Sequence, residues 1–368
     1  MIIFSGIRYA VADRQGRPVQ EPALSSLENI ETEVVACPQN PSRMDGVLGS
    51  MHSGEESSED CLRLGVSTPA LDGRRPVLVW IHGGAFVTGS GLYGRYGASE
   101  LARRGDIVVV SINYRLGALG FLYDPDNDVV NLGLEDQVCA LRWIKTNIAL
   151  FGGDPANITV FGQSAGAYSV LCHIAGLREP LFRRAVIASA PFLSVPARRM
   201  RAVTSRFLSS LGGDMENATI GRILEAQREV ERKSGGMPFA PVCPYLASPR
   251  QIMPGLDAVA LWCQQDDARV FVRGKLLSVI GTWLIFKRPM MRYAGRLERS
   301  GIRVSTRIFR WRHADGPFGA CHCLELPLIF GGWDLWKDAP FLSGVTREEF
   351  LENSSDLQED LCRFVRSE

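Results

Sequence analysis

The sequence predicts an α/β fold with a mostly parallel central sheet covered by helices, and two observations support this class. Apolar, β-branched runs typical of buried strands alternate along the chain with segments of helical periodicity. The 368 residues are also 46% hydrophobic, which is ample for one large core. Because no linker, repeat or low-complexity stretch divides the sequence, we expect one domain over residues 1–368, with a helical, cap-like insertion at approximately 195–300.

The expected strands are apolar runs at residues 76–81, 107–112, 158–161, 258–262 and 304–311. The apolar residues of 137–151 recur at helical spacing and predict a helix there. A second helix is expected directly after Ser164, and a last one near 357–365. Strands and helices that alternate in this way form a parallel sheet with both faces covered.

Ser164 lies in the sequence Gly-Gln-Ser-Ala-Gly, between a strand-like run and a helix-like run. This strand–turn–helix context is that of a nucleophile elbow, which exposes the serine hydroxyl at the end of a sheet. The turn is so tight that the positions two before and two after the serine tolerate little side chain, and Gly162 and Gly166 meet that demand. The alternative is a glycine-rich turn that happens to hold a serine.

An acyl-transfer serine needs hydrogen-bond donors that hold the oxyanion. A His-Gly-Gly sequence begins at His82, directly after the strand 76–81, and matches the loop that supplies oxyanion-hole amides in lipases and esterases. We therefore expect the backbone amides of Gly84, Ala85 and Ala165 to be the donors. An ordinary Gly-Gly turn after a strand is the alternative.

The catalytic base has to be one of five histidines. In this kind of site the chain order is serine, acid, histidine, which leaves His313 and His322. His313 ends the strand 304–311 too early and reads as a polar loop residue, whereas His322 lies in the loop beyond it. Spacing alone favours His322 but leaves His313 open.

These motifs resemble those of the type-B carboxylesterases, the α/β-hydrolase family of para-nitrobenzyl esterases, animal carboxylesterases and cholinesterases. The matching stretches run nearly end to end and also include residues 4–10, 58–64, 113–117, 133–137, 151–155 and 322–330. The resemblance implies an α/β-hydrolase fold and implies that His322 is the base. It also implies a shortened cap region, because the segments on either side of Asp267 are contracted.

The family usually places its acid, a glutamate, just after a strand. Here Asp267 falls on the glutamate position, after the strand 258–262, and Asp266 falls on the preceding aspartate. Aspartate and glutamate both serve in such triads. The alternative is two surface aspartates at a strand end. Ser189 matches a family serine that supports the acid by a hydrogen bond, and a buried strand-end hydroxyl is its alternative.

Composition excludes some partners. The formal net charge is +1, so no charge imbalance indicates a nucleic acid or an anionic membrane as partner. The longest apolar run, 276–286, is far shorter than the roughly 20 residues that span a bilayer. No signal peptide is visible, so we expect a cytoplasmic protein.

Nine cysteines without a secretory signal indicate a reducing compartment and mostly free thiols. The resemblance adds that Cys37 and Cys61 match a pair that is disulfide-bonded in secreted relatives. Cys321 and Cys323 flank His322, but no further cluster of ligands accompanies them, so no metal site is expected.

The sequence thus predicts a serine carboxylesterase that hydrolyses small-molecule esters through an acyl-enzyme. Ser164 would be the nucleophile, His322 the base and Asp267 the residue that orients it. No metal or organic cofactor is expected, and the sequence does not indicate an oligomeric state. The alternative from another class is a catalytically silent, cholinesterase-like binding module, but such modules typically lack the serine or the histidine. The resemblance places the choline-binding tryptophan of the cholinesterases within residues 37–61, and this stretch has no aromatic ring for a cation–π contact, so choline esters are disfavoured.

Overall fold

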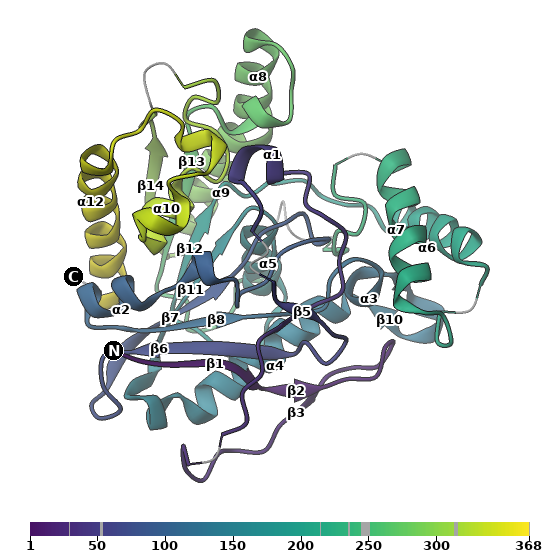
Figure 1. The fold of residues 1–368 in the computed structure, drawn as a ribbon, viewed down its shortest axis with the longest axis horizontal. Helices are drawn as coiled ribbons and strands as arrows, with labels where there is room; N and C mark the ends of the chain where they lie inside the picture. Colours follow the sequence, from purple (N-terminus) through teal and green to yellow (C-terminus); the bar gives the residue numbers. More distant parts are fainter. Residues whose placement is uncertain are drawn as a thin grey trace.

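The computed structural model describes residues 1–28, 30–51, 54–213, 215–234, 236–243, 251–312 and 316–367. Eight strands form one mixed sheet in the order β1-β6-β8-β7-β11-β12-β13-β14, and helices cover it on both sides (Figure 1). From β8 to β14 all neighbouring strands are parallel, whereas β1 and β6 pair antiparallel with their neighbours. The predicted mostly parallel, helix-covered sheet is confirmed. His313 and His52 lie outside the described residues.

The strands of the main sheet are β1 (Ile2–Arg8), β6 (Arg63–Thr68), β7 (Arg75–Ile81), β8 (Val108–Ile112), β11 (Gly153–Gln163), β12 (Arg184–Ala188), β13 (Ala258–Gln264) and β14 (Arg303–Phe309). Two-residue strands form three small ladders: β2 (Ala10–Val11) with β3 (Val19–Gln20), β4 (Val35–Ala36) with β5 (Glu56–Ser57), and β9 (Tyr123–Asp124) with β10 (Val129–Val130). All five residues of β8 are buried, as expected for a β-branched strand inside a parallel sheet.

The helices are α1 (Asp45–Leu48), α2 (Ser99–Gly105), α3 (Gly117–Phe121), α4 (Leu132–Asn147), α5 (Ala165–Gly176), α6 (Ala197–Leu211), α7 (Ile220–Ser234), α8 (Lys275–Gly281), α9 (Arg288–Arg299), α10 (Glu325–Phe330), α11 (Trp333–Trp336) and α12 (Arg347–Arg366). A π-helical turn (Thr282–Lys287) joins α8 to α9, and short 3₁₀ turns occur at Gly94–Tyr96, Pro125–Asn127, Ile148–Phe151, Asp267–Val270 and Pro340–Leu342. Within the stretch 195–300, α6, α7 and α8 lie at the periphery, whereas β13 is a strand of the main sheet (Figure 1).

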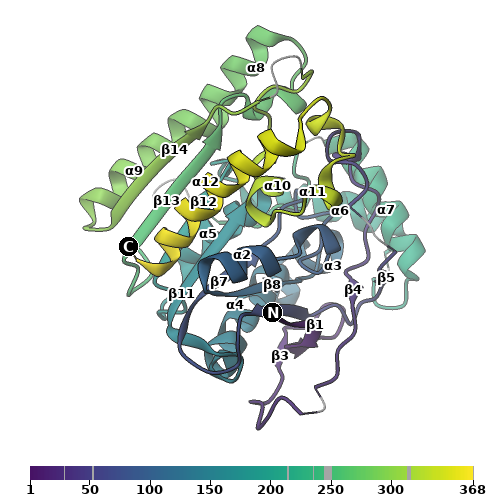
Figure 2. The same ribbon diagram turned by 60° about the vertical axis from the view of Figure 1, so that its left-hand side comes forward.

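The two faces of the sheet carry separate cores, as β7 illustrates. Val77, Val79 and Ile81 belong to one buried cluster and Leu78 and Trp80 to the other, because side chains alternate along a strand. Helices α4 and α5 contribute to the first cluster, and α2, α10 and α12 contribute to the second (Figure 2). The sheet is thereby fixed between two helical layers.

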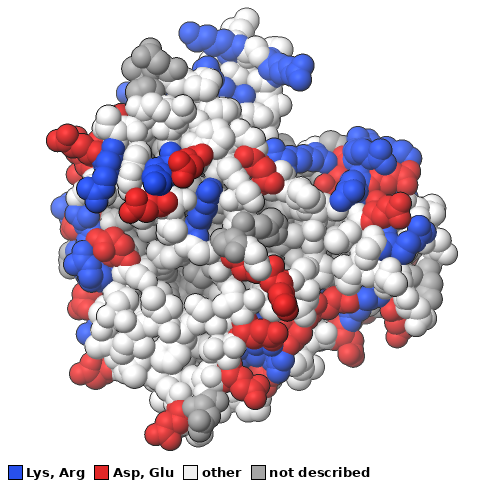
Figure 3. All heavy atoms as spheres, in the orientation of Figure 1, with Lys and Arg blue, Asp and Glu red and all other residues white. Residues whose placement is uncertain are grey.

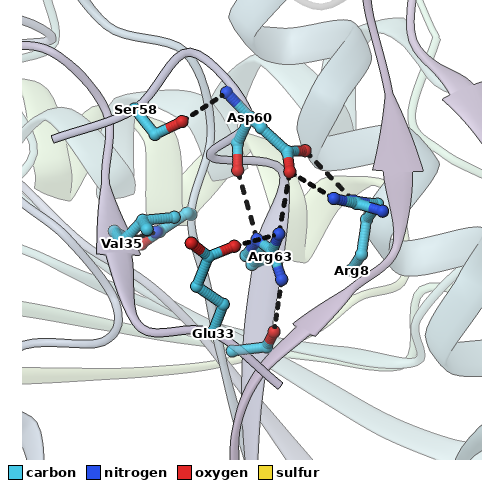
Figure 4. Close-up of polar contacts among 8 residues, drawn as sticks. Arg8, Glu33, Val35, Ser58, Asp60 and Arg63 are labelled. Atoms are coloured by element: carbon cyan, nitrogen blue, oxygen red, sulfur yellow. Dashed lines mark hydrogen bonds and ion pairs between the residues drawn. The ribbon is translucent and has the colours of Figure 1, made fainter. Parts of the chain in front are cut away.

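An ion-pair network holds the beginning of the chain to β6 (Figure 4). Asp60 accepts hydrogen bonds from Arg8 and Arg63, and Arg63 also donates to Glu33 at 2.5 Å and to the Gly6 carbonyl at 3.2 Å. Burial opposes the ionisation of Asp60, but the hydrogen bonds from the two arginines outweigh it and lower the pKa of this carboxyl.

Cys37 and Cys61, the pair implied by the resemblance, are both buried free thiols in the structure. The Leu116 amide donates to Cys37 Sγ at 3.2 Å. The hydrogen bond with Cys37, together with burial, raises the pKa of Cys61 well above its usual value. These thiols therefore contribute to the core as small apolar groups.

Arg115 and Asp136 form a buried ion pair that joins the end of β8 to α4. The guanidinium donates to both carboxylate oxygens at 2.7 and 2.9 Å, and the Arg115 amide donates to the same carboxylate at 3.0 Å. The two side chains are 4% and 0% exposed. The remaining guanidinium nitrogen donates to the carbonyls of Asp13 and Gly16, which fastens the N-terminal segment as well.

Replacing Asp136 by alanine should lower the free energy of unfolding by about 3–5 kcal/mol, because it leaves the Arg115 charge buried without a partner. The control is Asp128→Ala, which removes an exposed partner of Arg17 and should change stability little. Urea unfolding of both variants measures the difference. Equal small losses would contradict the structural role of the buried pair.

Candidate active site

Ser164 lies in the turn between β11 and α5 with φ 55° and ψ −118°, a conformation that side-chain-bearing residues rarely adopt. The turn leaves no room beside it. A Cβ on Gly162 would lie 2.4 Å from the carbonyl oxygen of Gly166, and a Cβ on Gly166 would lie 2.1 Å from that of Ile81. The Ser164 amide donates to the Ala188 carbonyl at 2.9 Å, which anchors the elbow to β12.

The loop after β7 lies directly against this elbow. A Cβ on Gly83 would lie 3.2 Å from the Cβ of Ser164. Gly84 has φ 111°, and a Cβ there would lie 1.9 Å from the Thr88 carbonyl oxygen, so only glycine fits. The next residue, Ala85, also has a positive φ of 55°. These left-handed conformations bring backbone, rather than side chains, up to the serine.

The expected oxyanion donors lie in this loop and at the start of α5. Among the residues that the structure describes, the amides of Gly84 and Ala85 donate no hydrogen bond. Ala165 is the first residue of α5, so its amide has no acceptor within the helix. Amides in such positions are free to bind an anion at a helix N-terminus.

Asp267 is completely buried beyond the end of β13 and uses both carboxylate oxygens. Oδ1 lies 2.8 Å from His322 Nδ1. Oδ2 accepts hydrogen bonds from the Ser189 hydroxyl at 3.1 Å and from the Gln264 amide at 2.7 Å. Asp266 faces elsewhere, toward the Ala320 amide at 3.2 Å. The structure therefore places Asp267, and not Asp266, beside the histidine.

The His322 ring is 2% exposed and packs against Phe271 and Phe286, with ring centroids 5.0 and 5.6 Å away. Burial opposes its protonation, but Cys323 and the bond to Asp267 outweigh burial and raise the pKa of His322 well above its usual value. Nε2, the nitrogen opposite Asp267, lies 3.3 Å from the Gln163 side-chain nitrogen. In the neutral ring, donation from the Gln163 amide to Nε2 leaves the proton on Nδ1, which faces Asp267.

The structure does not close the chain of hydrogen bonds onto Ser164. Ser189, Asp267 and His322 are joined in sequence, but within the described part of the chain the Ser164 hydroxyl makes no hydrogen bond to His322. The Gln163 amide occupies the Nε2 position instead. Catalytic hydrogen bonds of this kind often tighten only when substrate is bound.

Three residues near the site were missed by the sequence reasoning. Gln163, the variable residue of the Gly-x-Ser-x-Gly motif, also donates to Cys323 Sγ at 3.2 Å. Gln264 donates to Glu325 at 2.6 Å. Glu325 is the third missed residue. The sequence could have indicated Gln163, which precedes Ser164, and Glu325, which lies three residues after His322, but it contains no signal for Gln264.

Glu325 is a buried carboxyl next to this group, and one of its oxygens has no hydrogen-bond partner. Burial, followed by the charge of Asp267, raises the pKa of Glu325 to about 7. Cys323, which directly follows His322, has a positive φ of 72° although it is not glycine. The loop that carries the histidine is thus strained and holds a titratable group.

The two other described histidines, His82 and His173, make contacts that do not involve Asp267. His82 is buried, stacks on Tyr114 at 4.4 Å and contacts the Gly83 carbonyl, and His173 contacts Gln137 at 2.8 Å. Burial lowers the pKa of each ring to about 4. Both are therefore neutral structural groups at ordinary pH.

Over the described ranges, no group of three or more histidine, cysteine or acidic side chains is arranged to hold a metal ion. In the same part of the chain, no helix combines the length and apolar character needed to cross a membrane.

A mostly parallel sheet whose serine elbow and oxyanion loop meet at the strand ends defines an α/β-hydrolase. A model of the carboxylesterase family matches residues 1–243. A probable N-octanoylanthranilate hydrolase of Rhodococcus erythropolis is 37% identical over 99% of this chain and 89% of its own length. The phenmedipham hydrolase of Pseudarthrobacter oxydans is 31% identical over 100% of this chain and 86% of its own.

Solved structures agree with these sequence matches. A pNB esterase structure has a TM-score of 0.85 and 26% identity, with 99% of this chain and 86% of that chain covered. A thermophilic pNB esterase has a TM-score of 0.84, also at 26% identity, with 99% and 87% covered. The chain belongs to the carboxylesterase family and is a carboxylic ester hydrolase, which confirms the predicted resemblance and sets aside the silent binding module.

The two neighbouring aspartates can be separated by mutation. Asp267→Asn should lower kcat by about ten-thousandfold, because the amide cannot hold the His322 tautomer and stabilise its charged form. Asp266→Asn is the matched control and should cost far less, since that side chain faces Ala320. Steady-state kinetics with circular dichroism as folding control measures both. Equal losses would mean that the acid is wrongly assigned.

Glu325 should make stability fall as pH rises. Its pKa is about 7 in the folded protein against an ordinary value of 4.5, so the folded state keeps a proton that the unfolded chain releases between these pH values. Stability is therefore lost as pH rises from 4.5 through 7, by about 3 kcal/mol. Glu325→Gln lacks this loss, so its stability relative to wild type should increase over that range.

Urea unfolding at acidic and at mildly alkaline pH measures this difference. The exposed Glu348→Gln on α12 is the control and should show no such dependence. A stability difference between Glu325→Gln and wild type that stays constant with pH would contradict the burial argument.

Proposed function

We propose that this ester hydrolase works through a covalent acyl-enzyme formed on Ser164. The serine oxygen attacks the ester carbonyl while His322 accepts the hydroxyl proton. His322 then returns the proton to the leaving alcohol. Water attacks the acyl group by the same route, which releases the carboxylic acid and restores the serine. Asp267 holds the ring in the required tautomer and stabilises its charged form.

The observation that carries this proposal is the 2.8 Å contact between the buried side chains of Asp267 and His322, whose ring also contacts Gln163, the residue before the elbow serine. The Ser189 hydroxyl and the Gln264 amide donate hydrogen bonds to the other oxygen of Asp267. They thereby fix the orientation of this carboxylate toward His322. For proton transfer, Nε2 has to exchange its contact with Gln163 for one with Ser164. The raised pKa of His322 makes the ring a strong proton acceptor once it is neutral.

We further propose that the amides of Gly84, Ala85 and Ala165 bind the oxyanion of the tetrahedral intermediates. Positive φ values at Gly84 and Ala85 and the helix start at Ala165 support this role. Every reacting group is supplied by the chain, the ester and water, so the proposed reaction uses no cofactor. The nine cysteines are buried and form no disulfide within the described residues, which supports the proposed cytoplasmic location, where a reducing environment keeps thiols reduced.

The substrate class is proposed from the relatives. Their names denote hydrolysis of N-octanoylanthranilate and of phenmedipham. We propose that this chain accepts small esters with an apolar or aromatic part. A series of p-nitrophenyl esters of increasing acyl length, with N-octanoylanthranilate beside it, tests this range.

An organophosphonate or sulfonyl fluoride should label Ser164 covalently and abolish ester hydrolysis, because the elbow makes this serine the activated nucleophile. Peptide mass mapping identifies the modified residue. Ser164→Ala is the control and should neither label nor hydrolyse esters. Loss of activity with the label on another serine would overturn the assignment.

A further inference from the structure

The apolar run at 276–286 lies on the outside of the protein. It forms α8 and the π-helical turn, which project from the rest of the fold (Figure 1). Six large apolar side chains of this segment are about half exposed or more: Leu276 72%, Leu277 59%, Val279 52%, Ile280 44%, Trp283 49% and Leu284 52%. An apolar patch of this kind on a globular protein marks an interaction surface.

An ordinary surface helix turns its apolar face toward the core, whereas most apolar side chains of this segment face solvent. Its inward positions include the small polar residues Ser278 and Thr282, which are 4% and 1% exposed, and Phe286 at its end is the one large apolar side chain of 276–286 that is buried, at 4%. Ser278 donates to the Lys275 carbonyl, and the Thr282 hydroxyl accepts from the Ala268 amide at 2.9 Å. Along α8 and the first part of the π-helical turn, the polar side chains thus face the fold, and the six exposed apolar side chains are left for something outside it.

The charge around this face has one sign. Between Asp267 and Glu298 the sequence has seven basic residues and no acidic one, although the whole chain has a net charge of only +1. Arg273, Lys275 and Arg288 are exposed next to the apolar side chains. Figure 3 shows blue and no red side chains over the projecting part of the molecule. The surface is therefore suited to a negatively charged partner.

We propose that α8 and the π-helical turn bind the surface of an anionic phospholipid bilayer, with the helix lying in the interface. Exposed leucines and a tryptophan on one face, flanked by lysine and arginine, are the composition of interfacial helices. Such a helix lies along the membrane and does not cross it. A second copy of the chain fits less well, because two such faces would bring like charges together.

This surface adjoins the candidate active site. Phe271 precedes α8, is 56% exposed, and contacts the His322 ring at 5.0 Å. It also lines a cavity of about 500 Å³ together with Lys275, Ser278 and Phe318. A bilayer bound to α8 would therefore lie beside His322. The membrane inference goes beyond the proposed catalytic roles and does not depend on them.

The test is co-sedimentation of the full chain with phospholipid vesicles. The protein should bind vesicles of phosphatidylcholine containing phosphatidylglycerol more tightly than vesicles of phosphatidylcholine alone, and high salt should weaken the difference. Leu277→Glu should lower the partition coefficient at least about tenfold, because it removes a leucine that the bilayer would bury and adds a negative charge. Leu335→Glu on α11 changes a leucine that is 47% exposed and is the matched control.

Two further substitutions test how much the basic side chains contribute to vesicle binding. Arg273→Gln and Lys275→Gln should each weaken binding to the anionic vesicles about fivefold and leave binding to neutral vesicles unchanged. Arg198→Gln and Arg199→Gln, exposed on α6, are the controls. Circular dichroism verifies that every variant is folded.

Failure to bind anionic vesicles would overturn the proposal. So would binding that Leu277→Glu and Leu335→Glu reduce equally. A concentration-dependent dimer that Leu277→Glu dissociates, without vesicle binding, would show that a second copy covers the face and would also overturn it. Ester hydrolysis by these variants in solution should stay at the wild-type rate, which keeps this test separate from that of the catalytic roles.

Discussion

The close backbone contact between the ends of β7 and β11 is the constraint on which the candidate site depends. Gly83 and Gly166 have no space for a Cβ, because each lies against the backbone or side chains of the other loop. This contact brings the proposed oxyanion loop and the serine elbow together, where Ser164 has a strained backbone conformation. The strain is maintained by the parallel pairing of the strands below, where Phe161 lies beside Trp80 in register.

The second constraint on the site is the electrostatic interaction among its buried ionisable side chains. Asp267, His322 and Glu325 lie within a region closed to water, so each charge acts strongly on the others. The Asp267 carboxylate has three hydrogen-bond partners: the Ser189 hydroxyl, the Gln264 amide and the His322 ring. Its charge favours the protonated form of both neighbours. The site thus holds two buried carboxyl groups in different surroundings: Asp267 is fully hydrogen-bonded, whereas Glu325 has an unpartnered oxygen and a pKa of about 7.

Sequence predicted the fold and most of the site because both depend on local signals. Buried strands, glycines around Ser164 and the loop at His82 are visible as residue types in fixed order. Asp267 was predicted from the resemblance, because it falls on the position of the family's glutamate after a strand. Its pairing with His322, 55 residues later, and the separate direction of Asp266 required the fold itself. The Gln163 contact to Nε2 also escaped, since a side chain's direction is set by packing from several elements.

The exposed helix shows why average properties of a sequence hide local ones. A net charge of +1 indicated no charged partner, yet 30 residues between Asp267 and Glu298 carry basic groups alone. The length of the apolar run at 276–286 showed only that it is too short to span a bilayer. Periodicity finds an apolar face but not which way it points, because that depends on the neighbours that the fold provides. Here Ser278 and Thr282 make hydrogen bonds on the inner side, so the leucines face outward. Phe271 and Phe286, at the two ends of this exposed stretch, pack on the His322 ring, so the same segment forms part of the surroundings of His322 and of the surface beside it.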